Sequence, residues 1–153
     1  MLIRSLTVLL MFLGLLSVGC APSVPEVVSA TGTVTINGEP LPNALVSFTP
    51  TAEGLDGNHK CTGTTDDQGN FTLKNYAGVA GAYACKNIVT IVDGKAPKEA
   101  RSMDDGSAEI WNEYKASLKN RPIPKEYKSI GQTPLNIEVT TDQTEYNIEL
   151  TRK

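Results

Sequence analysis

The side chains in this chain that could carry chemistry are few: three cysteines (Cys20, Cys61 and Cys85) and one histidine, His59. A cysteine can bind a metal, form a disulfide, act as a nucleophile or carry a lipid. Because Cys61 and Cys85 do not form a C-x-x-C pair and His59 would add only a third ligand, we expect no metal site and no other cofactor. Serine-hydrolase, zinc-protease and phosphate-loop motifs do not occur in the sequence, so we expect no catalytic residue and no enzyme activity.

The surroundings of Cys20 predict export. Arg4 supplies a positive charge, residues 6–16 are apolar, and residues 17–19 (Ser-Val-Gly) are small. A charged start, a short apolar region and small residues at a cleavage site are typical of a secretory signal peptide, which we predict over residues 1–19. The alternatives are an uncleaved membrane anchor and cleavage without lipid attachment.

This segment resembles the lipobox of bacterial lipoproteins, with Ser17 where that motif usually has Leu. In that family the cysteine is lipidated and becomes the first residue of the mature protein. The resemblance implies that Cys20 is a lipidation site and that the membrane is a partner. Two or more acyl chains, at about 0.8 kcal/mol per buried methylene, would anchor the protein almost permanently. Because Ala21 follows the cysteine, as in the Gram-negative outer-membrane pattern, we expect a lipid-anchored protein of the cell envelope, at the outer membrane or cell surface rather than the inner membrane.

The remainder of the chain has the size of one domain. The net charge is −3 and no basic stripe occurs, so nucleic acid is not an expected partner. Residues 20–29 contain two prolines and no apolar pattern, and we predict that they are the lipidated cysteine and a flexible tether. Residues 30–153 are predicted to fold as a single β-domain.

Export also bears on the two remaining cysteines. In an oxidising compartment, Cys61 and Cys85 are predicted to form a disulfide. Such a bond would stabilise the fold by roughly 3 kcal/mol in the chain-entropy model. The alternative is a pair of free buried thiols.

Seven short segments have the β-branched composition or the apolar–polar alternation of strands, and turn residues bracket most of them. They are residues 31–36, 44–50, 61–65, 70–74, 83–92, 133–139 and 145–150. Asn37-Gly38 is a strong hairpin signal, because both residues tolerate positive φ. The pattern predicts an all-β fold, an antiparallel seven-stranded sandwich.

A helical insertion is predicted at about residues 104–120, before the last two strands. Residues 107–119 have helical periodicity, with apolar side chains on one side at Ile110, Trp111, Tyr114 and Leu118. We expect this side to pack against the sandwich. The alternative is that Trp111 and Tyr114 form a binding platform for sugar or peptide.

The segment from Asp66 to Asn70 is predicted to be a tight turn. The Asp66 carboxylate can accept hydrogen bonds from nearby backbone N–H groups, and Gly69 tolerates a left-handed conformation. Calcium is the alternative, because Asp66, Asp67, Gln68 and Asn70 all offer oxygens. A calcium loop needs six to eight oxygens in a fixed arrangement, and the EF-hand spacing is absent, so the structural turn is favoured.

The order of these pieces resembles the carboxypeptidase regulatory-like domain, which belongs with the transthyretin-like (prealbumin-like) β-sandwiches. GTVTINGEPLPNALVSFTP is similar to that family's G-x-P-L-x-G-A-x-V turn and strand, with Asn43 in place of the common glycine. GTTDDQGNFTL matches its T-D-x-x-G-x-F hairpin, and GAYACKNIVTI its P-G-x-Y strand, with Ala80 in place of proline. The resemblance implies a transthyretin-like, Ig-like sandwich. It does not extend to the ureide hydrolase of that fold, which needs several histidines and a C-terminal Tyr-Arg-Gly-Ser motif.

These observations favour a non-enzymatic, lipid-anchored module of the cell envelope with a structural or adhesion role. The alternative is a module that binds polysaccharide or peptide of the cell surface. Its binding residues would lie in loops 51–60 and 75–81 or on the helix with Trp111. Envelope polysaccharide or protein is the partner that both hypotheses allow.

Lipidation at Cys20 makes the first prediction. Mass spectrometry of the mature protein is expected to find a diacylated N-terminal Cys20, because the acyl chains alone supply the membrane affinity. The Cys20→Ala variant should no longer partition with membranes. An unmodified Cys20, or a Cys20→Ala variant that stays in the membrane fraction, contradicts the lipoprotein interpretation.

Overall fold

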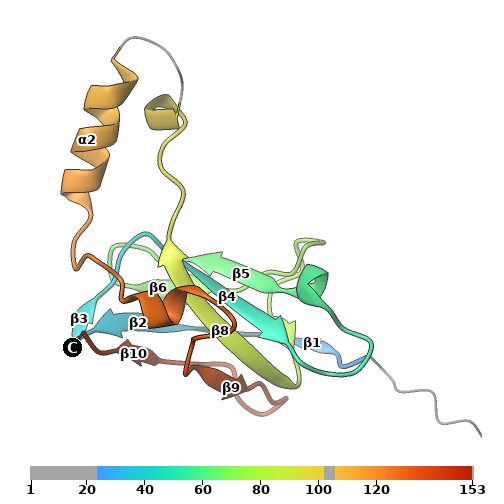
Figure 1. Ribbon diagram of the computed structural model, residues 1–153. Helices are drawn as coiled ribbons and strands as arrows, with labels where there is room; N and C mark the ends of the chain where they lie inside the picture. Colours follow the sequence, from blue (N-terminus) through green and yellow to red (C-terminus); the bar gives the residue numbers. More distant parts are fainter. Residues whose placement is uncertain (1–23, 102–105, 153) are drawn as a thin grey trace, which may run out of the picture.

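The computed structural model describes residues 24–101 and 106–152, and the predicted signal peptide and Cys20 lie outside the described residues. Over these residues the chain is mostly β, with several antiparallel sheets and one short α-helix (Figure 1). The strands are β1 (Val27–Val28), β2 (Thr31–Ile36), β3 (Glu39–Pro40), β4 (Ala44–Pro50), β5 (Cys61–Thr64), β6 (Asn70–Thr72), β7 (Ala82–Tyr83), β8 (Lys86–Asp93), β9 (Asn136–Glu138) and β10 (Ile148–Leu150). The helices are α2 (Ser107–Ser117) and the 3-10 turns η1 (Gly57–His59), η2 (Glu99–Arg101) and η3 (Lys125–Lys128). Within the described ranges, no helix has the length and apolar character needed to cross a bilayer.

Two four-stranded sheets and the two-stranded sheet of β1 and β7 make up the body of the protein, which we define as residues 24–93 and 121–152. One sheet has the order β5-β4-β8-β9, in which every neighbouring pair is antiparallel. In the other, β2 pairs with β10 on one side and with β3 and β6 on the other. The pairing of β10 with β2 is parallel, so the expectation of an entirely antiparallel arrangement was wrong for the last strand.

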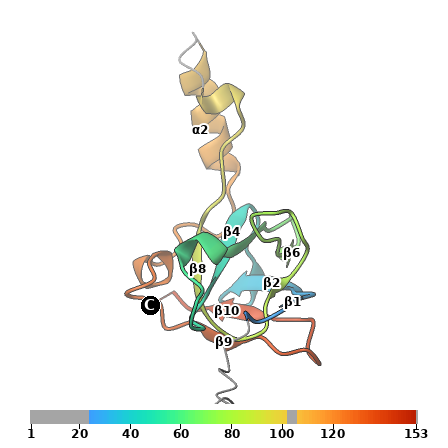
Figure 2. The same cartoon turned by 90° about the vertical axis from the view of Figure 1, so that its right-hand side faces the viewer.

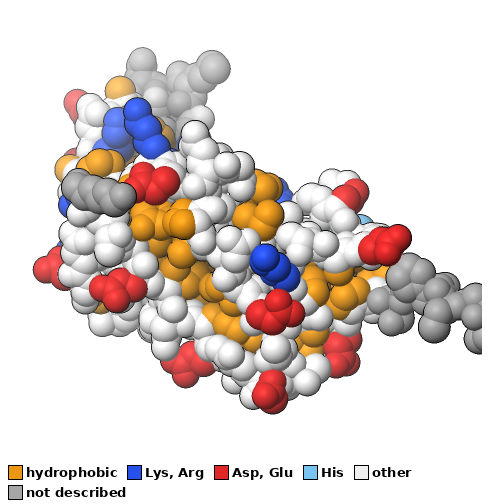
Figure 3. Space-filling view, turned by 60° about the horizontal axis from the view of Figure 1, so that its bottom comes forward, with side chains coloured by type: hydrophobic (Ala, Val, Ile, Leu, Met, Phe, Trp, Pro, Cys, Tyr) orange, Lys and Arg blue, Asp and Glu red, His pale blue; other side chains and the backbone are white. Residues whose placement is uncertain are grey.

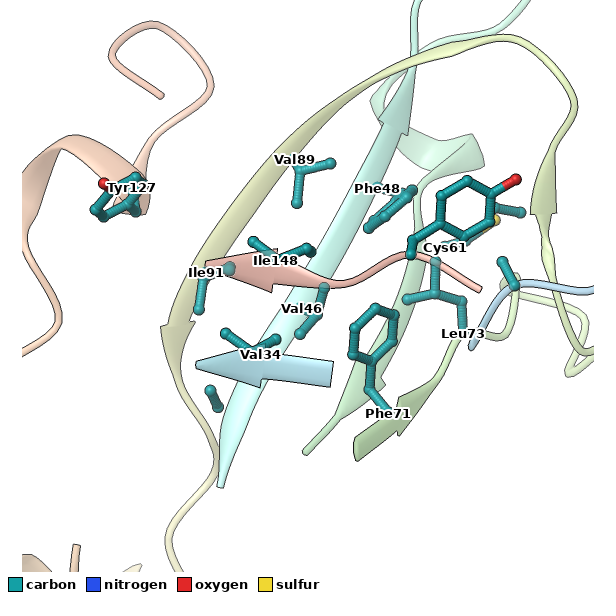
Figure 4. Close-up of a cluster of buried hydrophobic side chains, with 14 of the residues drawn as sticks. Val34, Val46, Phe48, Cys61, Phe71, Leu73, Val89, Ile91, Tyr127 and Ile148 are labelled. Carbon is teal, nitrogen blue, oxygen red and sulfur yellow. The ribbon is translucent and has the colours of Figure 1, made fainter. Parts of the chain in front are cut away.

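The hydrophobic core lies between these two sheets (Figure 4). Side chains alternate between buried and partly exposed along β2, β4 and β8, as the period of a strand requires. Phe48 of β4 joins the layers: its ring centroid is 6.3 Å from that of Phe71 and 6.2 Å from that of Tyr146, which come from the segments of the other sheet. Aromatic contacts of this geometry add to the energy of burial.

Most of the predicted strands are confirmed in place. Residues 31–36 and 44–50 match β2 and β4 at both ends. The predicted long strand at 83–92 is interrupted, because the chain kinks at residues 84–85 between β7 and β8. The tether is shorter than predicted, since Val27 and Val28 form β1 and pair with β7.

The turn at the start of β4 depends on a buried hydroxyl. Thr65 accepts a hydrogen bond from the Ala44 N–H (2.8 Å) and donates one to the Leu41 carbonyl (2.7 Å). Its side chain is 5% exposed, so water cannot replace these bonds. Thr65 therefore holds residues 41–44 against the loop that follows β5, and Asn43 within that segment adopts a positive φ of 48°.

Replacing Thr65 by Val keeps the shape and removes the hydroxyl. We expect Thr65→Val to lower the free energy of unfolding by about 2–4 kcal/mol, because a buried N–H and a buried C=O lose their partner. Chemical denaturation measures the change. Thr65→Ser retains the hydroxyl and is the matched control, with an expected loss of about 1 kcal/mol for the missing methyl. Equal losses in the two variants would show that the hydrogen bonds contribute nothing.

Candidate functional site

The feature with the strongest claim to function is an arm, described over residues 94–101 and 106–120, that leaves the body after β8 and stands away from it (Figures 1 and 2). Its described limbs are η2 and α2, which contact each other, and Ala100 of η2 is buried. The predicted helix is confirmed as Ser107–Ser117, but its packing against the sheets was wrong, because none of its residues is buried. The segment around η2 supplies the apolar contact that we expected from the sheets.

The apolar side of the helix is therefore only partly covered. Ile110 and Trp111 are each 39% exposed, whereas Tyr114 is half-buried at the base of the arm. The Trp111 and Tyr114 rings contact each other, with centroids 5.9 Å apart, and the Lys115 ammonium lies 5.7 Å from the Trp111 ring. Trp111 thus presents a planar aromatic surface beside a cation.

Tyr114 joins the arm to the body. Its hydroxyl accepts a hydrogen bond from the Asn43 side-chain amide and donates one to the Gly94 carbonyl at 3.2 Å. Asn43 also lies against Gly94, whose N–H donates to the Asn43 carbonyl. The outgoing limb of the arm is consequently fixed at the start of β4.

Arg121 fixes the returning limb. Its guanidinium donates to the Asp93 carboxylate, to the Lys119 carbonyl (2.9 Å) and to the carbonyls of Pro42 (2.8 Å) and Asn43 (3.1 Å). The side chain is 14% exposed, so these charge-assisted bonds are largely shielded from water. Three segments far apart in the sequence meet on this one side chain.

A groove of about 680 Å³ lies between the base of the arm and the body. Its lining combines lysines, a carboxylate, amides, hydroxyls and apolar side chains. The lining residues are Pro42, Asn43, Asp67, Gln68, Lys95, Pro97, Tyr114, Ser117, Leu118 and Lys119. Such a mixture can bind a polar ligand that offers both hydrogen-bonding and apolar surface.

The Asp66 turn forms one wall of this groove and is confirmed as a structural turn. Asp66 accepts from the Gln68 and Asn70 N–H groups (2.9 and 2.8 Å) and from the Asn70 side chain (3.1 Å). The Asn70 side chain, with the two backbone groups, holds the pKa of the Asp66 carboxyl below its ordinary value. These bonds occupy both oxygens of Asp66 and leave Asp67 and Gln68 to face the groove.

The predicted disulfide was wrong, because Cys61 and Cys85 are free thiols. Cys61 is buried opposite Phe48, and its thiol is directed to the His59 carbonyl at 3.7 Å. Cys85 lies in the kink before β8, with its sulfur 3.5 Å from the Lys86 carbonyl. Burial, and to a smaller degree the neighbouring Cys85, raises the pKa of the Cys61 thiol, so the reactive thiolate is disfavoured.

His59 lies at the opposite end of the body from the arm. Its Nδ1 is 2.7 Å from an Asp56 carboxylate oxygen, and this pair caps η1. The His59 side chain, followed by the Asn58 N–H, holds the pKa of Asp56 below its ordinary value. The His59 ring also meets the rings of Tyr76 and Tyr83 edge-on. Among the described residues, no group of three metal-ligating side chains occurs here or elsewhere.

Comparison with known proteins finds no match to this chain among protein-family models, curated proteins or solved structures. The resemblance to the carboxypeptidase regulatory-like domain therefore stays a prediction that rests on its motifs.

Sequence reasoning identified Trp111 and Tyr114 but missed the groove. Lys95 and Lys119 of the groove, and Arg121 at the base of the arm, carry no pattern that marks them, because only the fold brings them to this region. Asn43 did carry a signal: it replaces a glycine in the turn motif, and asparagine is the residue that next best tolerates positive φ. Loops 51–60 and 75–81, named for the binding alternative, lie at the far end from the groove (Figure 1).

The clamp made by Arg121 can be tested by truncation. Arg121→Met is expected to cost about 2–3 kcal/mol of unfolding free energy and to speed amide exchange in the arm, because three carbonyls and Asp93 lose a charged donor. Arg121→Lys should recover only part of the lost unfolding free energy, because an ammonium group cannot make the same set of hydrogen bonds as the planar guanidinium. Lys128 pairs with Asp93 at 3.6 Å and is 35% exposed, so Lys128→Met is the control, with an expected effect of about 0–1 kcal/mol. Unchanged exchange in Arg121→Met would refute the clamp.

Proposed function

We propose that this protein is a non-enzymatic, lipid-anchored module of the bacterial cell envelope, with a structural or adhesion role in which the arm meets the partner. The observation that carries the proposal is the distribution of apolar surface. Six large apolar side chains among the described residues are exposed. Two of them, Ile110 and Trp111, lie on the arm, and three, Val24, Tyr76 and Val79, lie toward the end where the described chain begins.

The arm and the first described residues occupy opposite ends of the body (Figures 1 and 2). A lipid on Cys20 would hold the end with the first described residues at the membrane. The arm would then point away from the membrane. Arg121 and Tyr114 support this role, because they give the arm a fixed base instead of a free hinge. The body itself is proposed to be a transthyretin-like sandwich of the carboxypeptidase regulatory-like type, on the strength of its two four-stranded sheets and its turn motifs.

A second candidate function is binding of envelope polysaccharide or peptide. The groove favours it, because Asn43, Asp67 and Gln68 can hydrogen-bond hydroxyl or amide groups above the apolar surface of Pro97 and Leu118. Trp111 lies on the same arm and would extend that surface. The proposal includes no catalysis: the Ser117 hydroxyl in the groove donates to the Tyr114 carbonyl at 2.7 Å and is not arranged as a nucleophile.

Binding to isolated envelope fragments tests both candidates. Purified lipidated protein is expected to bind the fragments saturably, and Trp111→Ala should weaken that binding about tenfold or more, as truncation of an aromatic anchor does. Ile130→Ala is the matched control, because Ile130 is 52% exposed but lies on the body. Binding that survives protease treatment of the fragments favours polysaccharide, and binding that is lost favours a protein. If binding is not saturable, or if Trp111→Ala does not weaken it, the role of the arm is refuted.

A further inference from the structure

We propose that the end of the body opposite the arm is a membrane-contact surface, on which Val24, Tyr76 and Val79 enter the headgroup region of the bilayer. These three residues, called the anchor end below, are 60%, 78% and 53% exposed. The inference rests on the proposed lipid anchor and goes beyond it: the lipid would tether the protein, whereas this surface would fix its orientation.

A series of three residue contacts places Tyr76 close to β1. Val27 of β1 pairs with Tyr83 of β7. The Tyr83 ring lies 5.9 Å from that of His59, and the His59 ring lies 6.4 Å from that of Tyr76. Figure 2 views this end of the body and shows β1, η1 and the loop before β7 together.

The loop that carries Tyr76 and Val79 is built to hold them outward. The Asn75 side chain accepts from the N–H groups of Ala77 and Val79, both at 3.0 Å, and the Asn75 N–H donates to the Val79 carbonyl. Gly78 closes the loop at a φ of 82°. Three large apolar side chains exposed at one end of the body are the kind of surface that serves in binding. Tyrosine is enriched at membrane interfaces because its ring is apolar and its hydroxyl is polar.

The number of residues between Cys20 and β1 limits how far the body can lie from the lipid anchor. Six residues separate Cys20 from Val27, which makes seven residue-to-residue steps, and β1 pairs with β7. Such a segment spans at most roughly 25 Å when fully extended. A lipid on Cys20 would therefore keep the anchor end within that distance of the headgroups, where a small contribution from three side chains would bring it into contact.

Charge favours this end over the side of the body. Between residues 136 and 150 the chain has four exposed acidic side chains and no Lys or Arg; they are Glu138, Asp142, Glu145 and Glu149. Figure 3 views the side formed by this part, where acidic side chains surround apolar ones. Anionic lipid would repel that side. Around the anchor end, three basic side chains (Lys60, Lys74 and Lys86) accompany three acidic ones (Glu26, Glu53 and Asp56), and Glu138 lies opposite Lys86 in the β8–β9 pairing.

Fluorescence quenching by brominated lipid tests the contact. Trp111 is the lone tryptophan of the sequence and lies on the arm, so the native protein reports the distal end. The lipidated full-length protein with Trp111→Phe and Tyr76→Trp moves the indole to the anchor end. In vesicles of phosphatidylcholine and phosphatidylglycerol with brominated acyl chains, this variant is expected to lose fluorescence as the brominated fraction rises. The native protein, and a Trp111→Phe control with Ile130→Trp, should keep theirs.

Flotation of the same samples separates the two proposals. Protein that floats with the vesicles while the introduced indole at position 76 stays unquenched overturns the membrane-contact surface and leaves the anchor standing. Equal quenching at positions 76 and 130 also overturns it, because the body would then have no fixed orientation. Protein that does not float overturns the anchor, and the contact surface with it.

Discussion

The pairing of β4 with β8 is the constraint on which the rest of the structure depends. Seven residue pairs, from Ala44–Asp93 to Pro50–Asn87, make it the longest ladder in the described chain. At about 3.4 Å per residue it spans roughly 20 Å. One end of the ladder leads into the arm and the other into the loops around η1, so this single pairing separates the two ends that expose apolar side chains. Its buried face, with Val46, Val89 and Ile91, also supplies one half of the core.

Residues 41–44, which form a corner at the start of β4, bind the base of the arm and so attach it to the β4–β8 ladder. Thr65 holds the corner from inside the body, and Arg121 and Tyr114 grip it from outside. All of these contacts involve backbone groups or the Asn43 amide, which is why the positive φ of Asn43 matters: it turns the side chain and carbonyl toward the arm. Structural stability and the position of the groove are therefore coupled, and a change at this corner would alter both.

The two ends of the molecule differ in how they present apolar surface. On the arm, Trp111 is supported by Tyr114 and Lys115, whose chemistry suits recognition of a polar partner. At the other end, Tyr76 and Val79 lie on a hydrogen-bonded loop amid charges of both signs, which suits the proposed lipid interface. A body between these ends would keep the proposed membrane and the proposed partner at a set separation, as a structural or adhesion role would require.

Local patterns in the sequence were sufficient for the strands β2 and β4, the Asp66 turn and the helix at 107–117, because alternation, turn chemistry and helical periodicity act over a few residues. They also carry the prediction of a lipid on Cys20. Tertiary structure alone decided the parallel pairing of β10 with β2, the free state of the Cys61 and Cys85 thiols, and the meeting of Lys95 and Lys119 at the groove. It also decided what the helix packs against. The partner is the segment around η2 with the buried Ala100, a residue with no distinguishing sequence pattern, and not the sheets that we expected. Contacts between distant segments depend on register and on the direction in which the chain leaves a sheet, and no short window of sequence contains that information.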